Sequence, residues 1–511
     1  MNPRKLKLFH TSDIHGQMLG VNYAQKRQAL DGTTRLKTFF NEMRNPHDLY
    51  IDTGDTLQGN ALAYYCAKHP ASVHPFSPVM NALECDAWTP GNHDFNFGLD
   101  LLKSFTESFN GEIINANIED ADGLFMGKNS HIFHLPGGLT LGIIGLTTHY
   151  IPNWENPANI QGLVFHDAFL TAQKEVRALR DQVDILVVNY HGGFEGDIDT
   201  FIPDSTTGEN QGLKMLETLP EIDVLLTGHQ HQRFVKNIGT TLVSQPGMNA
   251  GSVNVIEIPL DRPFKRGSLQ GKTVMLDAYE EDSEIQAMLD STESNTQVFL
   301  DQPMGSFDQD YLITDALDAR RQKHPVVTWI NDVQIKATGA DMALCGLGND
   351  VKGFQKSVTL RDILATYVYP NLLVVKALTG KAIKAALEQN AEFFTLKDGH
   401  IIIDERFDHP KKQYYNYDMF DPLVYTIDVR KPVGSRVSEI TLHGEPLKMD
   451  ATYQVAMNNY RAAGGGDFHM YKAAPLIHDT QKEIVEYLIE ALEKEPVIEI
   501  THQNNITILG D

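Results

Sequence analysis

The stretch Gly91-Asn92-His93-Asp94 decides how the first half of the chain is interpreted. It follows the short run Asp86-Ala87-Trp88 and places an amide and an imidazole side by side just past a predicted strand. Neither residue is informative alone. Similar polar stretches occur at Asp13-Ile14-His15-Gly16, Gly54-Asp55, His191-Gly192-Gly193 and Gly228-His229-Gln230-His231. We therefore interpret the five stretches as parts of one site.

Each of these stretches lies where a predicted strand ends. Short apolar runs predict strands over residues 6–11, 49–51, 183–188 and 224–226. Helical spacing of apolar residues predicts helices over 33–44 and 166–182. In layered α/β proteins the loops at the carboxyl ends of strands converge and collect ligand sites. We expect the five polar stretches to meet for this reason.

The side chains of these stretches are metal ligands by type. Asp13 and His15 are two residues apart and can reach one ion, and the two oxygens of Asp55 can bridge two ions. The first predicted ion is held by Asp13, His15, Asp55 and His231. The second is held by Asp55, Asn92, His191 and His229. Mixed imidazole, carboxylate and amide donors favour Mn²⁺, Zn²⁺, Fe or Co²⁺ over Ca²⁺ or Mg²⁺.

Two such ions predict phosphoester hydrolysis. They can hold both oxygens of an in-line displacement at phosphorus and activate water. His93 is next to a ligand but spare, and in its protonated form it can stabilise the phosphoryl oxygens or protonate the leaving oxygen. A lone Asp-x-His is more often a turn, and His-Gly-Gly alone is uninformative. Five such stretches in order at strand ends favour the metal site.

Length and charge limit the other possibilities. A chain of 511 residues is too long for one core. We predict a catalytic domain over 1–275, an acidic linker helix over 276–304 and an α+β domain over 305–511, which begins with a helix over 310–323. The formal net charge of -24 disfavours polymeric nucleic acid and anionic lipid, whereas a small nucleotide can still bind locally.

The predicted compartment is the cytoplasm. The three cysteines are scattered and form no disulfide framework, which fits a reducing environment. The chain starts with Met1-Asn2-Pro3-Arg4-Lys5 and has no apolar leader, and no run of about 18 apolar residues predicts a membrane span. An extracellular protein remains the alternative if a leader has been removed. We expect a monomer or a weak homodimer.

The motifs Asp13-x-His15, Gly54-Asp55, Gly91-Asn92-His93, His191 and Gly228-His229-x-His231 together resemble the calcineurin-like metallophosphoesterase superfamily, over roughly residues 5–260. The second half resembles the C-terminal domain of the 5′-nucleotidase family. This resemblance implies the metal assignments above and a four-layer αββα catalytic domain. It also implies a smaller α+β nucleotide-binding domain that rotates to deliver the nucleotide base.

Position 96 separates the branches of this family. True 5′-nucleotidases pair the catalytic histidine with an aspartate three residues later, and here that residue is Asn96. An amide can orient His93 but cannot hold it charged as a carboxylate does. This pattern looks like the 2′,3′-cyclic-nucleotide 2′-phosphodiesterase/3′-nucleotidase branch, and we expect His93 and Asn96 to act in catalysis. Three stretches are similar to that branch's motifs: Tyr369-Pro370-Asn371, Tyr415-Asn416-Tyr417-Asp418 and Asn458-Asn459-Tyr460-Arg461-Ala462.

Tyrosines in the second half are candidates for binding the base. Two of them can sandwich a base, each stack contributing roughly 1–3 kcal/mol. We predict Tyr415 and Tyr460 for this role, with Tyr417 as a spare, although any one tyrosine taken alone more often packs in a core. Gly465 is predicted to line the pocket, where backbone must approach the ligand, and Asn349 to contact the sugar or base.

Three functions remain open on the sequence. The first is hydrolysis of 2′,3′-cyclic nucleotides and 3′-nucleotides, which Asn96 and the tyrosine motifs favour. The second is a 5′-nucleotidase or nucleotide-sugar hydrolase. The third is a non-catalytic nucleotide-binding protein, which predicts a lost metal ligand, and none is lost.

Overall fold

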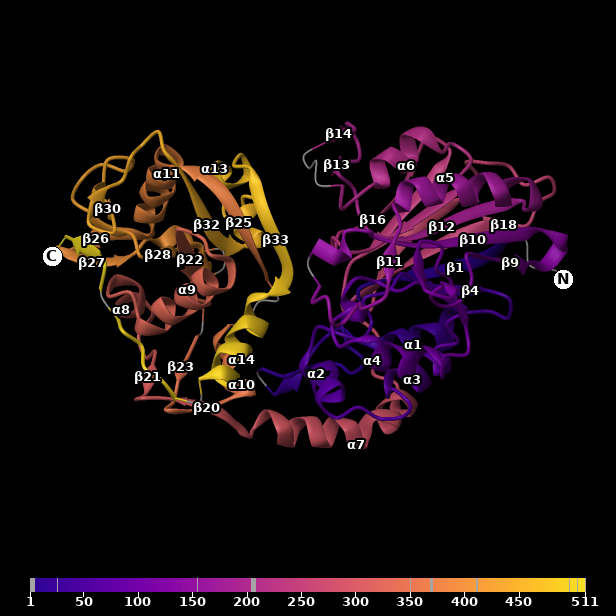
Figure 1. Ribbon diagram of the computed structural model, residues 1–511, viewed down its shortest axis with the longest axis horizontal. Coiled ribbons are helices and arrows are strands. Elements are labelled where there is room, and N and C mark those ends of the chain that lie inside the picture. The colour runs from indigo at the N-terminus through magenta and orange to yellow at the C-terminus, as the bar shows by residue number, and fades with distance from the viewer. Residues whose placement is uncertain are drawn as a thin grey trace. The chain divides into compact units, whose positions relative to one another are not determined.

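The computed structural model describes residues 5–24, 26–153, 155–203, 208–349, 351–367, 371–409, 412–495, 497–502 and 504–510. The chain divides into two compact units, Met1–Phe299 and Leu300–Asp511, which are described separately. Helix α7 (Ser283–Leu300) lies within the predicted linker 276–304 (Figure 1). Among the described residues, no helix is both long and apolar enough to cross a membrane. Tyr369 and Pro370 of the quoted tyrosine motif lie outside the described residues.

The first unit contains two six-stranded sheets. The first sheet, in spatial order, is β19 (Gln270–Met275), β18 (Ser252–Pro259), β1 (Lys5–Thr11), β4 (Leu49–Asp52), β5 (Ala87–Trp88) and β6 (Glu112–Ile113). The second is β16 (Arg233–Ile238), β17 (Thr241–Pro246), β15 (Val224–Thr227), β12 (Ile185–His191), β10 (Thr140–Thr147) and β9 (Ser130–His134).

Helices cover the outer faces of these sheets (Figure 1). On the side of the first sheet lie α1 (Thr33–Met43), α2 (Ala61–Lys68), α3 (Phe76–Ala82) and α4 (Leu99–Thr106). On the side of the second sheet lie α5 (Ala168–Leu179) and α6 (Gly212–Thr218). The arrangement confirms the expected four-layer αββα domain.

Strand β12 shows why this sequence forms layers. Its apolar residues alternate between two cores, as the two-residue period of a strand requires. Ile185 and Val187 point into the core between the sheets, whereas Leu186 and Val188 pack with the core beneath α5 and α6. Both faces of the strand are therefore buried, which accounts for its continuous apolar run.

The strands that carry the polar stretches run parallel to one another within each sheet. In the first sheet β1 pairs in parallel with β4, and β4 with β5. In the second sheet β12 pairs in parallel with both β10 and β15. The carboxyl ends of β1, β4, β5, β12 and β15 consequently carry all five polar stretches, as predicted.

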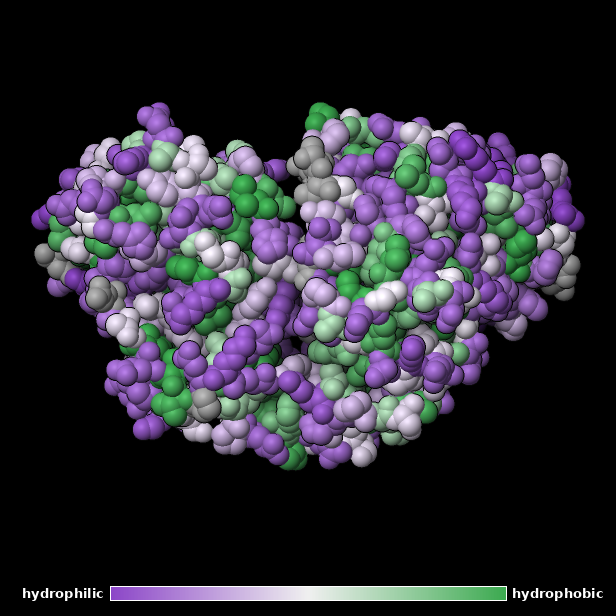
Figure 2. All heavy atoms as spheres, in the orientation of Figure 1, coloured by the Kyte–Doolittle hydropathy of each residue, from purple (hydrophilic) through white to green (hydrophobic). Residues whose placement is uncertain are grey.

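The second unit is an α+β domain. Its main sheet is β28 (Asp418–Asp421), β22 (Met342–Gly346), β32 (Thr452–Asn458), β25 (Leu372–Thr379) and β33 (Leu476–Glu483). A second sheet is β31 (Glu445–Pro446), β30 (Val437–Leu442), β29 (Val424–Asp428) and β35 (Ile506–Leu509). The longer helices are α9 (Pro325–Thr338), α10 (Leu360–Thr366), α11 (Gly380–Asn390) and α14 (Ile484–Lys494). Figure 2 shows hydrophilic residues over much of the visible face of each unit.

The predicted helix over 310–323 is wrong in its first part. Tyr311–Leu312 forms strand β21, which pairs with β23 (Gly353–Phe354). Helix α8 begins only at Ala316 and ends at Arg321, and the Asp315 side chain caps it by accepting from the amide of Asp318. A strand partner about forty residues away in the sequence overrides the local helical preference, which periodicity alone does not reveal.

Candidate metal centre

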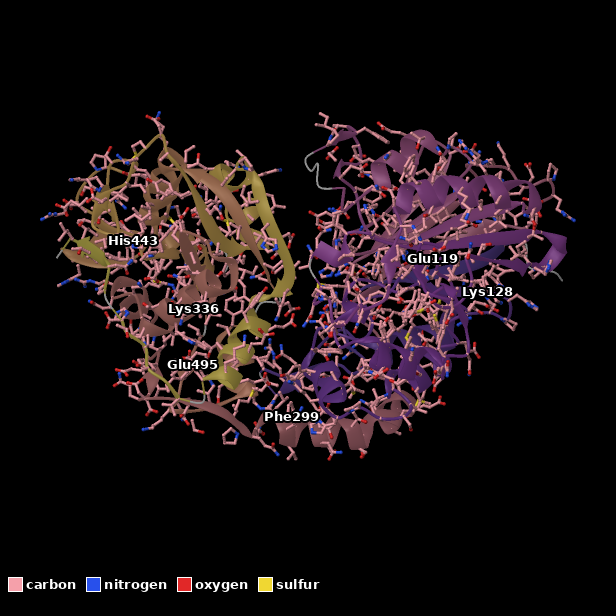
Figure 3. All side chains as sticks on the ribbon, viewed as in Figure 1. Glu119, Lys128, Phe299, Lys336, His443 and Glu495 are labelled. Atoms are coloured by element: carbon pink, nitrogen blue, oxygen red, sulfur yellow. The ribbon has the colours of Figure 1, made fainter. Side chains whose placement is uncertain are left out.

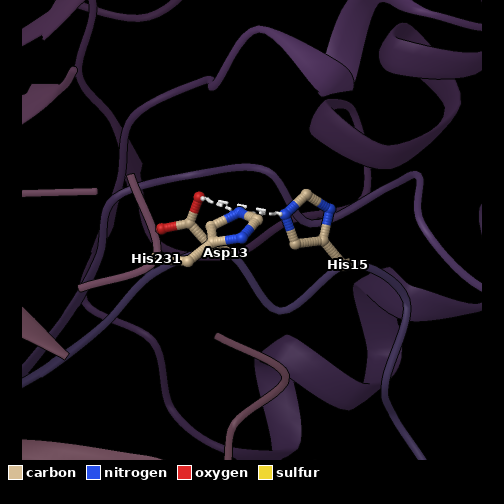
Figure 4. Close-up of side chains that lie close together, drawn as sticks. All are labelled: Asp13, His15 and His231. Atoms are coloured by element: carbon tan, nitrogen blue, oxygen red, sulfur yellow. Dashed lines mark hydrogen bonds and ion pairs between the residues drawn. The ribbon is translucent and has the colours of Figure 1, made fainter. Parts of the chain in front are cut away.

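One group of predicted ligands lies together at the ends of β1 and β15 (Figure 4). The ligand atoms of Asp13, His15 and His231 all lie within 4.8 Å of one another. The Nε2 atoms of the two histidines are 2.9 Å apart, and Nε2 of His231 is 3.4 Å from Oδ1 of Asp13. Two imidazole nitrogens and a carboxylate oxygen thus face one point.

A second group contains Asp55, His191 and His229, whose ligand atoms also lie within 4.8 Å of one another. Oδ1 of Asn92 lies 3.1 Å from Nε2 of His191 and 2.8 Å from Nδ1 of His229. Oδ2 of Asp55 is 3.1 Å from Nε2 of His191 and 4.0 Å from Nε2 of His15. Asp55 therefore lies between the groups, and the structure brings all seven predicted ligands together.

The backbone is strained where the ligands are presented. Positive φ values occur at Asp13 (55°), His15 (51°), Asp55 (57°), His229 (69°) and His231 (56°). Residues with side chains rarely adopt this left-handed region, and such strain clusters at functional sites. Gly91 is needed for a different reason. A Cβ atom there would lie 2.2 Å from Oδ1 of Asp55, so a side chain would displace that carboxylate.

Three of the histidines are positioned by a hydrogen bond to the ring nitrogen that faces away from the other ligands. This nitrogen is called the outer nitrogen, and the one that faces the ligands is the inner nitrogen. The contacts are Nδ1 of His15 with the carbonyl of Gln58 (2.9 Å), Nδ1 of His191 with the carbonyl of Thr53 (2.5 Å) and Nε2 of His229 with Oε1 of Glu209 (2.7 Å). Carbonyl and carboxylate oxygens only accept, so each outer nitrogen must donate. The inner nitrogen of each neutral ring then carries a lone pair toward the centre, as metal-binding histidines require.

The remaining chemistry of the site also fits two divalent cations. Buried Oδ2 of Asp55 has Nε2 of His191 as a neighbour at 3.1 Å and makes no regular hydrogen bond among the described residues. Burial favours the neutral form of Asp55, but the charges of His191 and His93 hold its pKa well below the usual range. Burial and the neighbouring His231 lower the pKa of His15 to about 4, so this ring is neutral near pH 7. Burial disfavours the charged form of His191, but Asp55 raises the pKa of this ring to about 9. Metal binds deprotonated carboxylates and neutral imidazoles, so an ion bound here would replace the proton on His191.

His93 lies beside the ligands without joining them. It begins the short helix η1 (His93–Phe95), and its backbone N–H donates to Oδ1 of Asp55 at 2.7 Å. Its ring is 5.4 Å from that of His15, centroid to centroid, at an interplanar angle of 67°. The ring nitrogen Nδ1 contacts Oδ1 of Asn96 at 2.6 Å. The structure therefore pairs the two residues predicted to act together.

Asp94 and Glu209 support the ligands, and the sequence interpretation assigned neither of them a role. Asp94 accepts from four backbone amides, those of Asp55, Thr56, Leu57 and Gly91, at 2.8–2.9 Å. It thereby fixes the loop that carries Asp55, and burial and Asp55 raise the pKa of Asp94 to about 6. The sequence could have indicated a role for Asp94, because it lies inside the Gly-Asn-His-Asp stretch. It could not have indicated one for Glu209, which lies in a loop without periodicity.

The tyrosine predictions have different outcomes. Tyr415 and Tyr460 lie near each other, with ring centroids 6.3 Å apart and planes at 69°, and Tyr460 is 42% exposed. Their stacking on a base stays a prediction. The spare assignment of Tyr417 is wrong, because its ring is fully buried and packs against Phe393 and Phe394 in the core.

Gly465 and Asn349 lie around the same tyrosines. A Cβ atom at Gly465 would lie 2.4 Å from the ring of Tyr460, so glycine is required for that ring to keep its place. The side chain of Asn349 donates to the carbonyl of Lys412 at 3.0 Å and accepts from the amide of Tyr414 at 2.9 Å. It holds the loop that leads to Tyr415, and its contact with sugar or base stays a prediction.

The two halves of the chain match two known families. The calcineurin-like phosphoesterase family model matches residues 6–233, and the 5′-nucleotidase C-terminal domain model matches residues 303–473. Together with the ligand geometry, these matches define a metal-dependent phosphoester hydrolase. A solved Staphylococcus aureus structure described as a putative 5′-nucleotidase is 32% identical, with a TM-score of 0.67, over 99% of this chain and 100% of that one. The chain belongs to the 5′-nucleotidase family.

Two curated bacterial relatives illustrate the spread within this family. The 2′,3′-cyclic-nucleotide 2′-phosphodiesterase/3′-nucleotidase of Salmonella typhimurium is 28% identical over 92% of this chain and 84% of its own length. The trifunctional nucleotide phosphoesterase YfkN of Bacillus subtilis is 24% identical over 98% of this chain. The chain spans only 39% of the length of that Bacillus protein.

Proposed function

We propose that this chain hydrolyses 2′,3′-cyclic nucleotides and 3′-nucleotides, releasing nucleoside and phosphate. The observation that carries the proposal is the pairing of His93 with the amide of Asn96 at 2.6 Å, beside two groups of metal ligands. A 5′-nucleotidase of this family would place a carboxylate at that position. The Salmonella relative, whose name states this activity, supports the same choice.

The proposed site divides the work between metal ligands and His93. Asp13, His15, Asp55 and His231 would hold one divalent ion, and Asp55, Asn92, His191 and His229 the other. When bound, such ions supply Lewis acidity to the phosphoryl group and activate water. His93 moves a proton at its Nε2 atom, toward the leaving oxygen or the phosphoryl oxygens, because Nδ1 is engaged by Asn96.

The metal identity is also a proposal. Four imidazoles, two carboxylates and one amide make a mixed set of nitrogen and oxygen donors. Such a set favours Mn²⁺, Zn²⁺, Fe or Co²⁺ over the all-oxygen sites of Ca²⁺. Reconstitution of metal-free protein with each ion, followed by turnover of one phosphodiester, would rank them.

The substrate proposal is tested by phosphate release. Purified protein with added Mn²⁺ is assayed against 2′,3′-cyclic AMP, 3′-AMP and 5′-AMP, and kcat/KM is compared. We expect the cyclic nucleotide and 3′-AMP to exceed 5′-AMP by at least about tenfold, which corresponds to about 1.4 kcal/mol in the transition state. A preference for 5′-AMP would favour the 5′-nucleotidase alternative, and tight nucleotide binding without turnover would favour a binding protein.

A further inference from the structure

His93 is connected to a glutamate through the side chain of Asn96. Oδ1 of Asn96 contacts Nδ1 of His93 at 2.6 Å, and Nδ2 of Asn96 donates to Oε2 of Glu155 at 2.5 Å. Glu155 lies just after the short helix η3 (Ile151–Asn153), on the loop that follows β10. Neither the proposed metal site nor the sequence motifs give this residue a role.

The surroundings of Glu155 make it an acceptor at both oxygens. Its second oxygen, Oε1, accepts from the backbone amide of Asn156 at 2.7 Å and from Nδ2 of Asn159 at 2.8 Å. Nδ2 of Asn159 also donates to the backbone carbonyl of Asn96 at 2.7 Å. All three groups that contact the carboxyl group are N–H donors, so both of its oxygens act as acceptors.

This arrangement fixes which way the amide of Asn96 points. An amide side chain can present either its oxygen or its NH₂ group to a neighbour. A carboxylate can only accept, so Nδ2 must face Glu155 and Oδ1 must face His93. Nδ1 of His93 must therefore be the donor, and Nε2 remains as the nitrogen that exchanges a proton with substrate.

We propose that Glu155 is a positioning residue for catalysis, acting on His93 through Asn96. The inference rests on the proposed function, because it assumes that His93 works on the phosphoester. The carboxylate of Glu155 does not contact His93 directly, because the amide of Asn96 lies between them. The amide of Asn96 can fix the orientation of the His93 ring without placing a full negative charge next to it.

The test is a double-mutant cycle between Glu155→Gln and Asn96→Asp. The three groups that contact the Glu155 side chain are all donors, so a glutamine there must turn its NH₂ group toward one of them. In Asn96→Asp, a second carboxylate would lie against Glu155, and like charges at this distance repel. In the double variant, the glutamine introduced at position 155 can donate to the carboxylate introduced at position 96. That carboxylate can still accept from His93.

We expect the double variant to regain most of the kcat that each single variant loses. Each single variant should lower kcat by about 10–100-fold, the usual effect of losing a group that orients an active-site imidazole, with KM changed less than about threefold. The double variant should recover to within about tenfold of the wild type. A role limited to bracing the loop predicts instead that the two losses add, and additive losses would overturn the proposal.

The control is Glu119→Gln, at a partly exposed glutamate on β7 (Ile118–Asp120) that is labelled in Figure 3. Its carboxylate contacts His166 at 2.9 Å and lies outside the site, so kcat should be unchanged. Metal content and melting temperature are measured for every variant. Loss of metal in Glu155→Gln would also overturn the proposal, because the residue would then act on the metal ligands.

The cycle is measured on 2′,3′-cyclic AMP, on 5′-AMP and on bis(p-nitrophenyl) phosphate. If the wild type prefers 5′-AMP, the proposed substrate class fails, yet the cycle on 5′-AMP still decides the role of Glu155. If the cyclic nucleotide is preferred but the losses add on every ester, the substrate proposal stands and the role of Glu155 is rejected.

Discussion

Glu209→Ala should weaken the binding of one of the two proposed ions and leave the other nearly unchanged. Oε1 of Glu209 accepts from Nε2 of His229 at 2.7 Å, and the opposite nitrogen, Nδ1, faces Asn92 in the second ligand group. Both side chains are almost wholly shielded from water. Loss of such a carboxylate behind a metal-binding histidine lowers metal affinity by about 10–100-fold. That range corresponds to about 1.4–2.8 kcal/mol.

The substitution should leave the loop in place. The backbone carbonyl of Glu209 accepts from the hydroxyls of Thr148 at 2.8 Å and Tyr190 at 3.3 Å, and neither contact uses the glutamate side chain. The assay is calorimetric titration of metal-free protein with Mn²⁺, fitted to two sites, together with turnover as a function of Mn²⁺ concentration. Glu217→Gln, on α6 and away from the ligands, is the matched control.

Turnover of Glu209→Ala should approach the wild-type value at saturating Mn²⁺, because all seven ligands remain. Two results would refute this reasoning. Unchanged affinity at both sites would mean that His229 does not depend on its outer partner. An equal loss at both sites would mean that Glu209 supports the whole loop rather than one histidine.

Four further predictions concern the remaining parts of the molecule. Asp55→Ala should abolish turnover and bound metal measured by elemental analysis, whereas His93→Ala should keep the metal and lose about 10²–10⁴-fold in kcat. Tyr460→Ala should raise KM for nucleotides by about 5–150-fold, equivalent to about 1–3 kcal/mol of stacking, without changing the kinetics of bis(p-nitrophenyl) phosphate. Burial lowers the pKa of His74 from 6.5 to about 3. Below pH 6.5 the imidazole is therefore protonated in the unfolded chain but stays neutral in the folded chain. The free energy of unfolding should therefore fall by about 1.6 kcal/mol between about pH 6.5 and pH 5 on account of this residue, and urea titrations of His74→Gln should show a smaller fall.

The sequence predicted the catalytic unit well because its signals are local. Each ligand stretch follows an apolar run, and parallel strands bring their carboxyl ends to one edge, so convergence follows from topology. The partners behind the histidines could not be predicted in the same way. Carbonyls such as those of Gln58 and Thr53 belong to the backbone and leave no trace in residue type.

The tyrosines show a different limit of sequence reasoning. Tyr415 and Tyr417 lie two residues apart around the short helix η7 (Tyr414–Asn416), where neither strand nor helix periodicity applies. Phe393 and Phe394 determine which of the two tyrosines is buried in the core. They lie more than twenty residues away in the sequence and pack on Tyr417. A pattern confined to one stretch cannot contain that information.

The carboxylates around the two ligand groups give a reason to expect an effect from Glu209, although it lies behind His229. The first group has one carboxylate of its own, Asp13, and lies near a second, because Oδ2 of Asp55 is 4.0 Å from Nε2 of His15. The second shares Asp55 but has the neutral amide of Asn92 where another carboxylate could stand. Glu209 contacts the outer nitrogen of His229 and would supply a carboxylate to the surroundings of a second ion, one imidazole further out. If this balance governs affinity, the ion lost first in Glu209→Ala is the one near Asn92, and Asn92→Asp should offset part of the loss.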